Sequence, residues 1–176
     1  MGRAVIRNKV KKYDIRMAHY IYNNLDWRFW LKFMNFLSRM GNGYLWGILG
    51  FGFLVFAQEN GRRIFMMGLL AITLNSIIAI MAKRAFARLR PACVLENVEV
   101  RVRPVDYYSF PSNHTMIAFS VSALTFHFYG LLALPMLLLA FLMGLSRIVV
   151  GAHFPSDVIV GALLGTLVAI LIVSLL

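Results

Sequence analysis

The stretch GAHFPSD, residues 151–157, places a histidine and an aspartate between two long apolar runs. Pro155 and Ser156 are typical of a helix start, so His153 should lie on the turn that precedes the helix. An aspartate that accepts the Nδ1–H of a histidine fixes its tautomer and leaves Nε2 as a nucleophile or base. Arg147 lies at the end of an apolar run, where a cation is costly unless it pairs with an acid or binds an anion. The alternatives are a His153–Asp157 pair beside an anion site, and a structural Arg147–Asp157 ion pair.

The stretch SFPSNHT, residues 109–115, has a similar construction. Pro111 cannot continue a preceding helix, and Ser112 or Asn113 is a good N-cap for the apolar run that follows. His114 would then lie in the first helical turn, where free backbone N–H groups and the helix dipole favour an anion. A plain helix cap with a histidine at the membrane interface is the simpler interpretation of this stretch alone.

The third stretch, KRAFARLRP, is rich in cations. Taken alone, Lys and Arg at the end of an apolar run are ordinary interfacial residues. Taken with the other two stretches, Lys83, Arg90 and Arg147 could neutralise a phosphate group. Cations, a helix terminus, an oriented histidine and a second histidine suffice for phosphoryl transfer through a phosphohistidine. No cluster of carboxylates or histidines for magnesium or zinc is apparent, Cys93 is the only cysteine, and no cofactor is expected.

Composition and pattern predict the elements that must position these residues. Of 176 residues, 60% are hydrophobic, well above the usage of soluble domains. Runs such as residues 64–82 and 158–176 approach the length that crosses a bilayer. We therefore expect an all-α integral membrane bundle with about five transmembrane helices, near residues 43–58, 63–85, 113–129, 131–149 and 156–175. Residues 1–16 are expected to form a basic tail and 17–40 an interfacial amphipathic helix, so the chain divides into 1–42 and a transmembrane domain, 43–176.

In the amphipathic segment, Trp27, Trp30, Leu31, Met34 and Leu37 recur at helical spacing. The net charge of +11 is concentrated in residues 1–42, with nine Lys and Arg, and in 83–103, with six. Beside apolar spans, such a surplus favours anionic lipid headgroups over nucleic acid as the partner. No cleavable signal peptide is expected, because no apolar region follows the basic start. Five spans would bring the three polar stretches to one membrane face.

These three stretches resemble the motifs of the type 2 phosphatidic acid phosphatase (PAP2) superfamily. The family pattern is Lys-x6-Arg-Pro, then Pro-Ser-Gly-His, then Ser-Arg-x5-His-x3-Asp, and the chain has KRAFARLRP, PSNH and SRIVVGAHFPSD in the same order and spacing. The match covers residues 83–157. One departure is Asn113 where the family usually has Gly; Asn tolerates unusual backbone angles, so the phosphate site should survive.

The resemblance implies a role for each matching residue. His153 would attack phosphorus, Asp157 would orient it, and His114 would protonate the leaving oxygen. The phosphoryl oxygens would be held by Lys83, Arg90, Ser112, Arg147 and backbone N–H groups near Asn113. The implied function is a metal-independent membrane lipid phosphatase acting on phosphatidic acid, phosphatidylglycerophosphate, undecaprenyl pyrophosphate or a lipid A phosphate. A phosphotransferase with the same site and a non-enzymatic phospholipid-binding or transport protein are the alternatives.

The side of the membrane on which the site lies is a point of conflict. The positive-inside rule places the basic face in the cytoplasm. The resemblance instead implies a multi-pass protein of the cell (inner) membrane with an extracytoplasmic site, and we adopt that expectation. Sequence alone leaves the oligomeric state open.

Overall fold

The structure is a computed structural model that describes residues 2–24, 28–56, 58–95, 98, 101 and 106–175. Within these ranges it is helical, without a strand; Leu89 and Tyr108 form one isolated antiparallel bridge. The order is α1 (Gly2–Asn24), α2 (Arg28–Met40), α3 (Tyr44–Phe56), α4 (Gln58–Phe86), α5 (Pro91–Val94), α6 (Asn113–Tyr129), the 3-10 helix η1 (Gly130–Ala133), α7 (Leu134–Val149) and α8 (Pro155–Leu175). The all-α expectation is confirmed.

Among the residues that the structure describes, three stretches are long and apolar enough to cross a membrane: Asn60–Phe86, Asn113–Val149 and Pro155–Leu175. The second of these contains two helices, because the chain turns at η1, where Gly130 has a φ of 55°. α3 is apolar but has only 13 residues. Large apolar side chains such as Phe56, Phe141 and Leu163 point outward, as expected of surfaces that face lipid. The chain is therefore a helical membrane protein.

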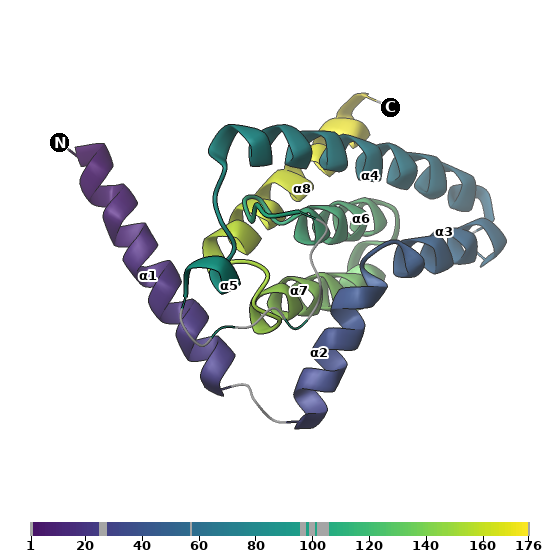
Figure 1. Cartoon of the computed structure of the whole chain (residues 1–176). Helices are drawn as coiled ribbons and strands as arrows, with labels where there is room; N and C mark the ends of the chain where they lie inside the picture. Colours follow the sequence, from purple (N-terminus) through teal and green to yellow (C-terminus); the bar gives the residue numbers. More distant parts are fainter. Residues whose placement is uncertain are drawn as a thin grey trace.

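α6 lies at the centre of the bundle, with α4, α7 and α8 packed around it (Figure 1). One buried cluster joins α6 to α2, α3 and α7 through Leu37, Trp46, Val121 and Met143. A second cluster joins α6 to α4 and α8: Ala71, Leu124, Val168, Ala169 and Ile172.

α6 and α8 approach at the level of their backbones. A Cβ added to Gly165 would lie 2.1 Å from the carbonyl oxygen of Met116, and one added to Gly161 would lie 2.8 Å from that of Ser112. A buried polar contact reinforces this packing: Asn75 donates to the Ser120 hydroxyl at 2.7 Å, and that hydroxyl donates to the Gly165 carbonyl at 2.5 Å. Asn75 thereby links α4 to the close α6–α8 pair.

The N-terminal region differs from the expectation. Residues 1–16 were expected to be a tail, but α1 continues from Gly2 to Asn24, because no Gly or Pro interrupts residues 3–24. The amphipathic segment 17–40 is thus shared between the end of α1 and α2. Within α2 the expected face is confirmed, since Met34 and Leu37 are buried against α7 while Arg28 and Arg39 are exposed. Trp27 lies outside the described residues.

Candidate active site

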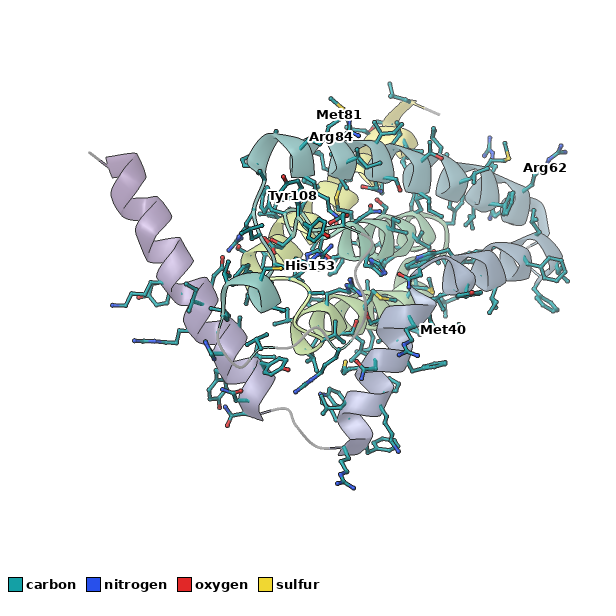
Figure 2. All side chains as sticks on the ribbon, viewed as in Figure 1. Met40, Arg62, Met81, Arg84, Tyr108 and His153 are labelled. Atoms are coloured by element: carbon teal, nitrogen blue, oxygen red, sulfur yellow. The ribbon has the colours of Figure 1, made fainter. Side chains whose placement is uncertain are left out.

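His153 and Asp157 lie where α7 ends and α8 begins, and Figure 2 shows His153 within the bundle. The turn is held by the carbonyl of Arg147, which accepts hydrogen bonds from the N–H groups of Ala152 and His153, both at 3.1 Å. Gly151 has a φ of 73°, a backbone conformation that a glycine adopts without strain. Helix α8 then starts at Pro155, as the sequence indicates.

Arg90 contacts the nucleophile expected from the sequence. Its Nη1 lies 3.2 Å from Nε2 of His153 and also donates to the Ala152 carbonyl at 2.8 Å. A guanidinium has donors only, so Nε2 must accept and carries a lone pair. The neutral imidazole then has its proton on Nδ1, which is the tautomer that nucleophilic attack through Nε2 requires.

His153 is also held in its neutral form. Burial, and then the positive charges of Arg147, Arg90 and Lys83, hold the pKa of His153 well below its ordinary value. These three cations act electrostatically on His114 as well, so two histidines and three cations share one site. The sequence predicted this convergence.

Asp157 is fully buried, and its contacts differ from those expected. Its Oδ2 accepts the Phe154 N–H at 2.8 Å and lies 3.8 Å from Nδ1 of His153, which is longer than a hydrogen bond. Its Oδ1 accepts a hydrogen bond from Arg88 at 2.7 Å. The alternative Arg147–Asp157 ion pair is therefore not formed; Arg147 instead donates to the Ser38 hydroxyl of α2.

Ser112 precedes the first residue of α6 and acts as its N-cap by position, although its side chain makes no capping hydrogen bond. Its N–H donates to the carbonyl of Asp157 at 3.1 Å, which ties the start of α6 to the start of α8. Asn113 is the first residue of α6 and donates to Ser76 of α4 at 3.5 Å. Asn113 has ordinary helical backbone angles, so its tolerance of unusual angles is not needed at this position.

His114 contacts the turn between α2 and α3. Its Nε2 lies 2.8 Å from Oδ1 of Asn42, and an amide oxygen can only accept, so Nε2 of His114 carries a proton. The neighbouring Gly41 is closely packed as well, since an added Cβ would lie 2.6 Å from Cδ2 of His114. This turn therefore orients the histidine expected to donate a proton.

The cations Lys83 and Arg90 already bind an anionic side chain. Asp106 accepts from Nζ of Lys83 at 2.7 Å and from Nη2 of Arg90 at 2.9 Å. Nε of Arg90 also donates to the Asp106 carbonyl at 2.8 Å. Burial by itself would raise the pKa of Asp106, but the hydrogen bond from Lys83 and the charges of Lys83 and Arg90 outweigh it, so that pKa is lowered.

A cavity of about 290 Å³ lies between α3, α4 and α6. It begins at Gly43, next to the Asn42 that contacts His114, and its wall is apolar: Trp46, Phe53, Phe65, Leu69, Val121 and Leu124. An apolar cavity that ends next to the turn contacting His114 suits a hydrocarbon chain.

Comparison with known proteins decides the family. The model of the PAP2 superfamily matches residues 65–176, which include every residue assigned to the site from the sequence. The chain belongs to the PAP2 superfamily. The crystal structure of Aquifex aeolicus LpxE aligns with this chain with a TM-score of 0.80 at 31% identity over 90% of this chain and 93% of that one.

Two curated relatives are similar in sequence. The bacitracin transport permease protein BcrC of Bacillus licheniformis is 32% identical over 132 residues, which are 73% of this chain and 65% of the relative. An undecaprenyl-diphosphatase of Sulfolobus acidocaldarius is 32% identical over 149 residues, 81% of this chain and 68% of the relative. The chain thus spans about two thirds of each. Relatives of this PAP2 protein thus include proteins named as phosphatases of lipids, such as the undecaprenyl-diphosphatase.

Four residues at the PAP2 site were missed by sequence reasoning: Asp14, Asn42, Arg88 and Asp106. Arg88 lies within the six unspecified residues of the first motif and looked like an ordinary interfacial cation. Asn42 and Asp14 lie outside residues 83–157, and only tertiary packing brings them to the site. In the part of the chain that the structure describes, no three His, Cys, Asp or Glu residues are grouped as metal ligands.

Proposed function

We propose that this protein hydrolyses a lipid phosphate or pyrophosphate at the membrane surface through a phosphohistidine on His153. The observation that carries the proposal is the 3.2 Å contact between Nε2 of His153 and Nη1 of Arg90. It directs the lone pair of the nucleophile toward a cation that would hold the phosphoryl oxygens. Attack on phosphorus would therefore occur where the charge of the transition state is compensated.

The reaction would proceed in two steps. The Nε2 lone pair attacks phosphorus, the P–O bond to the lipid breaks, and His114 gives a proton to the departing oxygen. Water then attacks phosphorus while His114 takes its proton, the P–N bond breaks, and inorganic phosphate leaves with the Nε2 lone pair of His153 restored. Lys83, Arg90 and Arg147 would neutralise the phosphoryl oxygens in both steps, with Ser112 and the N–H groups at the start of α6 beside them. The residues supply all the charge that the reaction needs, so we propose that it is metal-independent.

The apolar cavity, which begins at Gly43 next to the Asn42 that contacts His114, supports a lipid as substrate, because it would take hydrocarbon while the cations hold the phosphate. Among the lipids expected from the sequence, undecaprenyl pyrophosphate is the first to test, since one similar relative carries the name undecaprenyl-diphosphatase. Phosphatidic acid, phosphatidylglycerophosphate and lipid A complete the panel.

The test is phosphate release from each lipid by purified protein in detergent, comparing wild type with His153→Gln. His127→Gln is the matched control, because His127 is exposed near the other end of α6. We expect release from at least one lipid, none above background with His153→Gln, and an acid-labile, alkali-stable phosphoprotein after rapid quenching. Transfer of phosphate to an acceptor other than water would show a phosphotransferase, and turnover by His153→Gln would refute the mechanism.

A further inference from the structure

Helix α1 contributes a buried carboxylate to the back of the site. Asp14 is only 4% exposed, although α1 extends along the side of the bundle and its first turns point away from it (Figure 1). Its Oδ1 accepts the N–H of Ser156 at 2.9 Å, and its Oδ2 accepts the Ser156 hydroxyl at 2.5 Å. Ser156 lies in the first turn of α8, where backbone N–H groups have no partner within the helix. Asp14 therefore caps the helix that carries Asp157.

Arg88 connects Asp14 to Asp157. Its Nη2 donates to Oδ2 of Asp14 at 2.6 Å, and its Nη1 donates to Oδ1 of Asp157 at 2.7 Å. Nη1 also donates to the Ser156 hydroxyl at 2.7 Å, and the guanidinium lies 4.2 Å from the centre of the Phe154 ring. One cation thus contacts three residues of the segment 154–157, which follows the nucleophile.

We propose that Asp14 and Arg88 are positioning residues that hold Asp157, and through it His153, in the geometry for catalysis. The proposal rests on the proposed function, because it concerns the rate of phosphoryl transfer. Arg88 and Phe154 N–H fix the two oxygens of Asp157, so the carboxylate cannot rotate freely. Its Oδ2 stays 3.8 Å from Nδ1 of His153, where it can approach as the imidazole gains positive charge.

The role of Asp14 follows from the charges. Asp157 is fully buried and Arg88 is largely buried, and a guanidinium with one carboxylate partner would draw that partner toward itself. Asp14 shares the guanidinium and so limits its hold on Asp157. In Asp14→Asn, Asp157 is the remaining carboxylate partner of Arg88, so the guanidinium attracts it more strongly. The start of α8 also loses a charged hydrogen-bond acceptor. Asp157 should then stabilise the positively charged imidazole less well.

The test is steady-state kinetics of the purified full-length protein with the lipid that the panel identifies. We expect Asp14→Asn to lower kcat about 10- to 100-fold, by analogy with the hydrogen-bond partners of metal ligands, with KM little changed. Asp14→Glu should recover part of the rate. Arg16→Gln is the control, because Arg16 lies on the same helix and is exposed, and it should behave as wild type.

A double-mutant cycle separates positioning from general stabilisation. If Asp14 acts through Asp157, then adding Asp14→Asn to Asp157→Asn should cost less than about threefold in kcat, whereas a purely structural effect would multiply the two losses. If Asp14→Asn does not fold, the double variant Asp14→Asn/Arg88→Gln provides a second test, because it also removes the cation that Asp14→Asn leaves with one partner fewer. This double variant should fold and should have a low kcat.

Each outcome has one interpretation. A wild-type kcat in folded Asp14→Asn, or in the folded double variant Asp14→Asn/Arg88→Gln, overturns this inference but not the proposed lipid phosphatase activity. Fully multiplicative losses of kcat in the double-mutant cycle have the same meaning. If wild-type protein releases no phosphate from any lipid of the panel, the proposed function and this inference both fail.

Discussion

Asp106 competes for the cations that should bind phosphate, and its removal gives a sharp prediction. Its two carboxylate oxygens accept from Lys83 and Arg90, in positions that two phosphoryl oxygens would take. A phosphate that binds both cations must therefore replace the carboxylate. We predict that Asp106→Asn binds vanadate and inorganic phosphate more tightly than wild type.

The contacts set the size of the effect. A hydrogen bond to a charged group contributes about 1.5–3 kcal/mol when buried, whereas exposed ion pairs contribute about 0–1 kcal/mol. The Asp106 side chain is 40% exposed while Arg90 is 3% exposed, so the two contacts together should be worth about 1–2 kcal/mol. Since 1.4 kcal/mol is a factor of ten, the Kd for vanadate should fall about 5- to 30-fold.

The assay is vanadate titration of purified protein, with phosphate release to measure product inhibition. Tyr107→Phe is the control, because Tyr107 is the neighbouring residue and is 79% exposed. Weaker vanadate binding by Asp106→Asn would refute the competition and show that Asp106 orients Lys83 and Arg90 for the substrate. An unchanged Kd would show that the carboxylate leaves these cations at no cost.

Further predictions concern the rest of the site. Full phosphate release in excess EDTA is expected, and a loss that magnesium restores would contradict metal independence. The pKa of His153 is lower in the folded protein than in the unfolded chain. Below about pH 6.5 the unfolded chain therefore binds a proton at His153 that the folded protein does not, so acid should lower the free energy of unfolding. The melting temperature of wild type should therefore fall more between pH 7.5 and 5 than that of His153→Gln, and parallel curves would contradict the assignment. Asn42→Ala should slow turnover of lipid substrates more than turnover of an aryl phosphate. The substitution removes the hydrogen-bond partner of His114, the expected proton donor, and only poor leaving groups need that proton. Equal losses of turnover on both substrates would contradict this role of His114.

Much of the bundle follows from the sequence, because bilayer-length apolar runs admit few structures besides helices. The described helices α6 and α8 begin within a residue of the expected positions, at Asn113 and Pro155, where proline and serine mark the start. α4 begins at Gln58, five residues before the expected span, because polar residues extend a helix beyond the hydrocarbon.

The contacts between charged residues could not be predicted in the same way. The spacing of His153 and Asp157 suggested a direct hydrogen bond, yet Asp157 bonds Arg88 and Phe154 N–H. An arginine within KRAFARLRP gives no sign of which acid it will meet, and Asp14 lies about 140 residues from Ser156 in the chain. Such pairs depend on how α1 and α4 pack against α8, which local patterns do not encode.

The close approach of α6 and α8 has a consequence for how lipid preference can diverge. Gly161 and Gly165 leave no room for a side chain, and these two helices carry His114 and Asp157. Substitutions at these two glycines would move α6 and α8, and with them the reacting groups. The contact between α6 and α8 should therefore tolerate little variation. The cavity walls contributed by α3 and the first half of α4 carry none of those groups, so their side chains can change in size more freely. Selection for a new lipid should therefore act on the groove around Phe53 and Phe65, leaving the chemistry untouched.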